Sequence, residues 1–139
     1  MTRYFIDRTN SMQTQPFIDD VAQRAQLADD DIARRTTMAT VETLCIYLPR
    51  QQTFELASQL PKDIAQAAEA GAQQAADAPE EITLERFFAQ VATRAELPAR
   101  DIEPAIRAAA SVFKQALTRG ESVDVVMDAP PDLDALLSG

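Results

Sequence analysis

The chain has 139 residues, of which 46% are hydrophobic and 25% charged, and its formal net charge is −9. This length fits one domain with a sizeable core, while three glycines are too few for the many tight turns of a β-sandwich. Because both halves of the chain carry more acidic than basic side chains, we expect no nucleic-acid partner and no anionic membrane partner.

The N-terminal segment, residues 1–13, has no helical periodicity and no continuous apolar stretch, so we do not interpret it as a secretory signal. We expect a loose arm or a short docking helix there. No apolar run in the chain approaches the ~18 residues needed to cross a bilayer, and a single cysteine permits no internal disulfide. These features together predict a cytoplasmic protein.

Residues 14–69 are expected to form a first helical repeat of about four helices. Thr14 is the expected cap of its first helix, and the second helix should run from about residue 31 to residue 48, after a turn and cap in the DDD motif. The segment TFELASQL, with Phe54 expected to point inward, predicts a third helix. Pro61 then begins an alanine-rich fourth helix.

The second of these helices is apolar on two faces, which is typical of a buried or central helix. One apolar stripe consists of Val41, Leu44, Cys45 and Leu48. The other consists of Ile32, Ala39 and Ile46. We interpret the Ile32, Ala39 and Ile46 stripe as a candidate interface, covered either by another part of the chain or by a second copy in a homodimer.

Residues 70–82 are rich in alanine and glutamine and predict a linker or a frayed helix end. Residues 83–137 predict a second helical repeat in the same order as the first. Thr83 is its expected first cap, Gly120 the expected C-terminal cap of its long helix, and Pro131 lies near the start of its last helix.

The two repeats are related by sequence. The segment FIDDVAQRAQL, residues 17–27, shares six of eleven positions with FFAQVATRAEL, residues 87–97, at an offset of 70, and the match continues at an offset of 69 through Pro61 and Pro130. Each unit is too small to bury its own core. We therefore predict an all-α fold in which two tandem helical repeats pack as one pseudo-twofold bundle.

Several short motifs resemble a known family. They are VETL at 41–44, LP at 48–49, LASQLP at 56–61, FFAQVATRAEL at 87–97, SVF at 111–113 and RGE at 119–121. In these motifs the chain resembles the bacterial domain-of-unknown-function family 2267, over about residues 16–137. It departs from the family pattern at Gln51-Gln52, where Gly-Glu is usual, and at DAPP in place of a second QLP. The resemblance implies an all-α tandem-repeat fold and brings no assigned activity or catalytic residue.

The chain offers few groups for catalysis or metal binding. Histidine is absent, which removes the commonest general base and metal ligand. Cys45 lies among apolar neighbours and is interpreted as a small core residue rather than a reactive thiol, and the three aspartates at 29–31 lack the spacing of a calcium loop. We expect no catalytic residue, no cofactor, no metal and no enzymatic activity.

Arg24 and Arg94 occupy equivalent positions in the two repeats. In one interpretation each arginine lies in the last turn of its helix and satisfies terminal carbonyls or a nearby carboxylate. In the other interpretation the two arginines form a pseudo-twofold pair that binds one anionic ligand. We favour the structural role.

Two functional hypotheses follow from different classes of protein. The first is a non-catalytic interaction module, either self-associating as a homodimer or binding an unidentified protein partner. The second is a small-ligand-binding protein with an apolar pocket between the repeats, lined by Phe17, Leu44, Phe87 and Phe113. An enzyme that uses paired carboxylates is the least supported alternative, because no acid pair lies alone among apolar residues.

Overall fold

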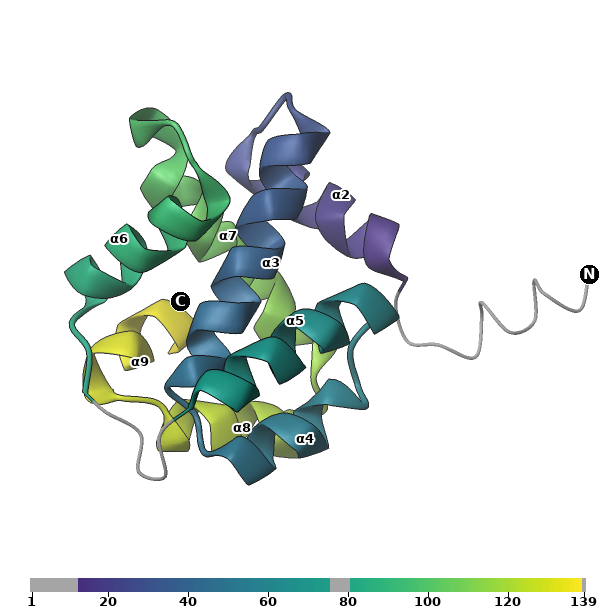
Figure 1. Cartoon of the computed structure of the whole chain (residues 1–139). Coiled ribbons are helices and arrows are strands. Elements are labelled where there is room, and N and C mark those ends of the chain that lie inside the picture. The colour runs from purple at the N-terminus through teal and green to yellow at the C-terminus, as the bar shows by residue number, and fades with distance from the viewer. Residues whose placement is uncertain (1–12, 76–80, 139) are drawn as a thin grey trace, which may run out of the picture.

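The computed structural model describes residues 13–75 and 81–138, and this part of the chain is all-α (Figure 1). It contains eight α-helices, one short 3₁₀ helix and no strand. The helices are α2 (Thr14–Ala25), α3 (Asp30–Ile46), α4 (Arg50–Ala57), α5 (Lys62–Gln74), α6 (Leu84–Ala95), the 3₁₀ helix η1 (Ala99–Asp101), α7 (Ile102–Ala116), α8 (Arg119–Asp128) and α9 (Pro131–Ser138). The arm expected over residues 1–13 lies outside the described residues, apart from Gln13. None of the described helices is long and apolar enough to cross a membrane.

Helix α3 lies at the centre of the molecule and contacts α2, α4, α5, α6 and α7 (Figure 1). The Asp29 side chain caps its N-terminus by accepting a hydrogen bond from the backbone N–H of Asp31. The buried hydroxyls of Thr36, Thr37 and Thr43 donate to backbone carbonyls one turn earlier, which lets a helix with polar side chains be buried on several sides. The prediction of a central helix is confirmed.

Helices α2 and α6 end in the same way. Gln26 and Glu96 both adopt left-handed backbone conformations, with φ of 56° and 53°. The following leucines close the turn, since the N–H of Leu27 donates to the carbonyl of Ala22, and the N–H of Leu97 donates to the carbonyl of Ala92. The RAQL and RAEL motifs therefore encode equivalent helix ends.

Helix α5 packs closely on α3 through small side chains. Ala67, Ala68, Gly71 and Ala72 are all buried on this helix, and they allow the two backbones to approach each other. Residues 70–74, the start of the segment expected to be a linker or a frayed helix end, form the end of α5, and residues 76–80 of that segment lie outside the described residues. Gly71 and Ala72 are buried, whereas Gln73 and Gln74 are exposed to solvent.

The second half of the described chain packs around α7, which contacts α2, α3, α6 and α9. A single hydrophobic core runs through both halves and includes Phe17, Leu44, Phe87 and Phe113. Helix α2 contacts α7, and α6 contacts α3. Each half thus packs its first helix on the long helix of the other half.

Three expected helix ends can be compared with the structure. Thr83 caps α6 as predicted, because its hydroxyl accepts a hydrogen bond from the N–H of Arg86. Thr14 was expected to be a cap, which is wrong: it is the first residue of α2. The prediction for Gly120 is also wrong, because α7 ends at Ala116 and Gly120 lies inside α8.

Candidate functional site

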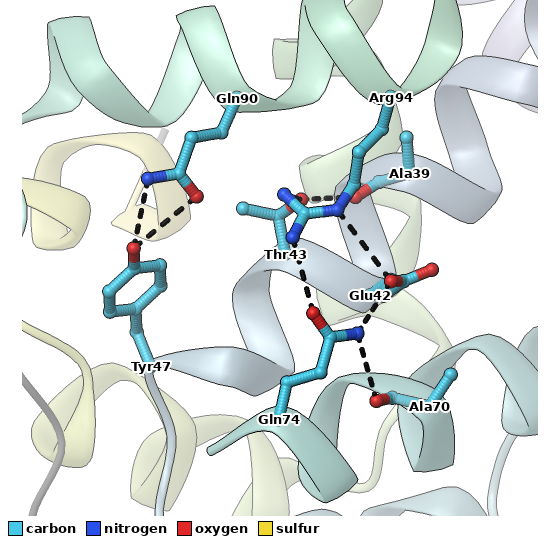
Figure 2. Close-up of polar contacts among 8 residues, drawn as sticks. All are labelled: Ala39, Glu42, Thr43, Tyr47, Ala70, Gln74, Gln90 and Arg94. Atoms are coloured by element: carbon cyan, nitrogen blue, oxygen red, sulfur yellow. Dashed lines mark hydrogen bonds and ion pairs between the residues drawn. The ribbon is translucent and has the colours of Figure 1, made fainter. Parts of the chain in front are cut away.

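Arg94 joins three helices through a polar cluster (Figure 2). From the last turn of α6, its Nη1 donates to the Thr43 hydroxyl on α3 at 3.2 Å and its Nη2 donates to Gln74 Oε1 on α5 at 3.3 Å. Its Nε lies 3.6 Å from a Glu42 carboxylate oxygen. The Gln74 amide also donates to Glu42 at 2.7 Å, so the four side chains form one connected network.

A second polar contact strengthens the same seam. The hydroxyl of Tyr47, the residue that follows α3, and the Gln90 side chain on α6 lie within hydrogen-bonding distance, at 3.0 Å from Gln90 Nε2 and 3.3 Å from Gln90 Oε1 (Figure 2). Gln90 lies one turn before Arg94 along α6, so polar bonds hold two successive turns of α6, one against α3 and one against the residue that follows α3.

Arg24 makes a corresponding set of contacts with α7. Its Nε lies 3.0 Å from Asp20, one turn earlier on α2. Its Nη1 donates to the Ser111 hydroxyl at 3.0 Å, and its Nη2 donates to Gln115 Oε1 at 2.5 Å. The guanidinium therefore ties the end of α2 to the long helix of the other half of the chain.

The two arginines occupy separate networks in the structure. Every guanidinium nitrogen of Arg24 and of Arg94 already has a protein partner. Within the described residues they share no partner, and their contacts lie on different helices. This geometry favours the structural role over joint binding of one anion, and the role itself stays a prediction.

Arg94 borders two open hollows, one between α3 and α6 and one lined by residues of α6. One has a volume of about 350 Å³ and is lined by Arg35, Met38, Ala39, Glu42 and Arg94. The other has a volume of about 590 Å³ and is lined by Ala89, Gln90, Thr93 and Arg94. The guanidinium of Arg35 is also occupied, because it bonds to Asp31 and to the carbonyls that end α6. Neither hollow presents an unpaired charge to a ligand.

The candidate interface residues Ile32, Ala39 and Ile46 are only partly accessible. Ala39 is buried, while Ile32 and Ile46 are half-buried. Ile46 packs against the hydrophobic core. The stripe thus has partial cover from the chain itself, and its use as an interface stays a prediction.

The four side chains expected to line an apolar pocket are packed in the core of the described residues. Phe17, Leu44, Phe87 and Phe113 each have 0% of their surface accessible, so no water-sized space touches any of them. Cys45 is equally buried, and burial raises the pKa of its thiol to about 12. In the described part of the chain, no group of three or more acidic or thiol side chains could hold a metal ion.

Exposed apolar side chains lie on α4 and α8. Among the described residues, the large hydrophobic side chains that are exposed are Phe54 at 55%, Val123 at 51% and Met127 at 76%. We call the surface formed by the exposed residues of these two helices the α4–α8 face. Phe54 was expected to point inward, and that prediction is wrong.

Helices α4 and α8 are neighbours in space (Figure 1). The Gln52 amide on α4 donates to a Glu121 carboxylate oxygen on α8 at 3.0 Å. The backbone N–H of Thr118, at the start of α8, donates to Gln59 Oε1 at 2.7 Å. The exposed apolar side chains of the two helices therefore belong to the same end of the molecule.

The sequence held a signal for this face that the prediction missed. Gln52, Thr53, Leu56 and Ala57 are the buried residues of α4, and on a helix this set leaves Phe54 on the opposite side. The offset of 69 also pairs Phe54 with Val123, and both are exposed. The link between the two helices that the sequence offers is an apolar residue at both of these paired positions.

A protein-family model matches most of the chain. Residues 14–136 match the model described as "Uncharacterized conserved protein (DUF2267)". The match covers nearly the same residues as the family resemblance noted in the sequence. No curated protein matches the chain.

Proposed function

Since the chain belongs to the DUF2267 family of uncharacterized conserved proteins, we propose a function from its own surface: a non-catalytic, cytoplasmic helical module that binds another protein through the α4–α8 face. The observation that carries this proposal is the exposure of Phe54, Val123 and Met127 on neighbouring helices. Contiguous apolar patches are rare on monomeric proteins and mark contact surfaces, so we take these three side chains as the apolar part of the proposed face.

A repeated architecture would explain why α4 and α8 both expose an apolar side chain. We propose two tandem repeats related by a pseudo-twofold axis, with α4 and α8 as the third helix of each. Three observations support it: the helix orders match, α2 and α6 end in equivalent turns, and each packs on the long helix of the other half. Gln52 and Glu121, which are equivalent at the offset of 69, contact each other, as residues beside such an axis would.

The absence of enzymatic activity is part of the proposal. Histidine is absent from the chain, and the only cysteine is buried with a raised thiol pKa. The protein therefore has no histidine to act as a base and no accessible thiolate to act as a nucleophile. The guanidinium groups of Arg24 and Arg94 are fully occupied by protein partners. Binding needs none of these groups.

Self-association through Ile32, Ala39 and Ile46 is the other form of an interaction module. We expect Ile46→Glu to separate the two forms when molar mass is measured by light scattering. Conversion of a dimer to a folded monomer would support that stripe as a seam. A wild-type protein that is already monomeric, and a variant that loses stability, would support cover within the chain.

Site-specific photo-crosslinking tests the proposed face directly. A photoreactive phenylalanine analogue replaces Phe54 in one full-length variant and Glu85, an exposed residue of α6, in the control variant. We expect discrete protein adducts in cells from position 54 and none from position 85. Equal adducts from both positions, or none from position 54 and a further variant at Met127, would overturn the proposed face.

A further inference from the structure

We propose that the partner segment of the α4–α8 face is a basic amphipathic helix. This inference rests on the proposed function, because it specifies the chemistry of the partner that binds there. It follows from the arrangement of apolar and acidic side chains on the two helices, and from the charge of the whole chain.

Helix α8 presents an apolar strip beside an acidic strip. Val123 and Met127 are one turn apart, so they lie on one side of the helix, and both are exposed. Asp124 and Asp128 follow them directly and form the neighbouring strip. In the described part of the chain, neither carboxylate has an ion pair or a hydrogen-bond partner.

Helix α4 repeats the same arrangement. Phe54 is exposed and is followed by the exposed Glu55, and the offset of 69 pairs these two residues with Val123 and Asp124. The Glu55 carboxylate also has no partner among the described residues. The face therefore combines apolar contacts with free negative charges on both of its helices.

The basic side chains of the face do not balance these charges. The Arg50 guanidinium is directed to the end of α5, where its Nε and Nη2 donate to the carbonyls of Ala72 and Ala75 at 3.1 Å and 2.7 Å. Arg119 is the other basic residue of α4 and α8, and both arginines are exposed. Against these two stand Glu55, Glu121 and the aspartates of α8, so the face is acidic.

Charge and area both favour a basic helix over a second copy. A second copy would bring an equally acidic face, and each chain carries a net charge of −9, so the approach is repulsive. The surface area of three partly exposed side chains is also much smaller than the roughly 800 Å² that each partner buries in a standard protein–protein interface. A single helix that places apolar residues against the exposed apolar side chains, with lysine or arginine beside them, matches both the acidic charge and the small area of the face.

A synthetic helix provides the probe. We expect the full-length protein to bind an amphipathic peptide of leucine and lysine, roughly 18 residues long, with affinity that falls as salt is added. The comparison peptide has the same leucine positions with glutamate in place of lysine. Binding is measured by fluorescence anisotropy, and helical content of each protein variant by circular dichroism.

Two pairs of substitutions locate the binding. Asp124→Lys with Asp128→Lys should weaken the Kd for the basic peptide by about tenfold or more, as should Val123→Gln with Met127→Gln. The matched control, Glu69→Lys with Glu85→Lys, makes the same change in net charge on exposed positions of α5 and α6. We expect that control to change the Kd by about threefold or less.

Other outcomes would overturn the proposal in distinguishable ways. Equal weakening by the control pair would mean general attraction to an acidic protein. A dimer that the α8 substitutions dissociate would identify a second copy as the occupant. If the peptide does not bind while crosslinking at Phe54 yields a partner, the basic-helix inference fails and the interaction function stands. If crosslinking also fails, both fail.

Discussion

Gly71 illustrates how a single residue sets the distance between two helices. A Cβ atom added at this position would meet the backbone carbonyl oxygen of Glu42 and would lie 2.9 Å from Cys45 Cβ. A backbone carbonyl in the middle of α3 cannot move aside as a flexible side chain would. The close packing of α5 on α3 therefore requires glycine at this position.

Gly71→Ala should destabilise the protein by about 1–3 kcal/mol, because the steric cost exceeds the gain in helix propensity. Gly120→Ala is the matched control, since a Cβ there meets nothing within 4 Å. That variant should be more stable by about 0.5–1 kcal/mol, because it removes a glycine from a helix. Urea denaturation measures both changes, and equal effects of the two substitutions would contradict the close approach.

Cys45 gives the stability a pH dependence. The folded thiol has its pKa raised from 9.0 to about 12, so the stability it contributes is fully present below pH 9 and is lost as the pH rises toward 12. Over that interval the thiol ionises in the unfolded chain before it ionises in the folded one. We expect the free energy of unfolding to fall with a contribution of up to ~1.4 kcal/mol per pH unit.

The Cys45→Ala variant isolates this contribution, because it retains every other group that titrates in the same range. Its free energy of unfolding should fall less steeply above pH 9 than that of the wild type, when both are measured by urea denaturation across this range. Parallel pH profiles for the two proteins would show that the thiol is not buried in solution.

At the level of helices, the two arginines hold α2 and α6 against the long helix of the opposite half. Arg24→Ala and Arg94→Ala should each lower the free energy of unfolding by roughly 1 kcal/mol, a modest value because both side chains are about one-third exposed. Circular dichroism should show that the fold remains. Arg100→Ala is the control, since Arg100 is 86% exposed and pairs with its neighbour Asp101.

The opposite result would point to ligand binding. If Arg24→Ala and Arg94→Ala both kept wild-type stability and a co-purifying anion disappeared from each, the two arginines would serve a shared ligand. Mass spectrometry of small molecules released from the purified proteins provides that measurement.

The helices could be predicted from sequence more readily than their orientation. Apolar spacing indicates α2, α3 and α6, and cap residues mark the starts of α3 and α6, because these are local properties of the chain. The orientation of α4 depends on Gln52 reaching Glu121, 69 residues later, and a short helix with polar buried side chains has only a weak apolar pattern. The predicted direction of Phe54 was wrong for this reason.

The same limit applies to the candidate site. Arg24 and Arg94 could be found because they recur at equivalent positions in the sequence. Their partners Ser111 and Glu42 could not be found, since these lie on the opposite half and only tertiary packing brings them together. The burial of Gly71 was hidden likewise, because a stretch of alanines lacks the large apolar residues that mark a core.

For the molecule as a whole, the two halves depend on each other for burial. Helix α2 packs on α7, α6 packs on α3, and α3 packs on α7. We expect residues 1–75 alone to be unfolded as a monomer by circular dichroism and urea titration, because the partners of α2 and α3 are missing. Residues 76–139 added in equimolar amount should restore helical signal, and a cooperative, monomeric transition for the first fragment alone would contradict this expectation.

The packing of α2 on α7 and of α6 on α3 has a consequence during synthesis on the ribosome. At roughly 5–20 residues per second, the apolar side of α2 emerges on the order of ten seconds before α7, the helix that covers it. In that interval Phe17, Ile18 and Val21 have no completed core to enter. The nascent first half is therefore the stage at which chaperones would encounter this protein, and the stage at which a slowed ribosome would expose it longest.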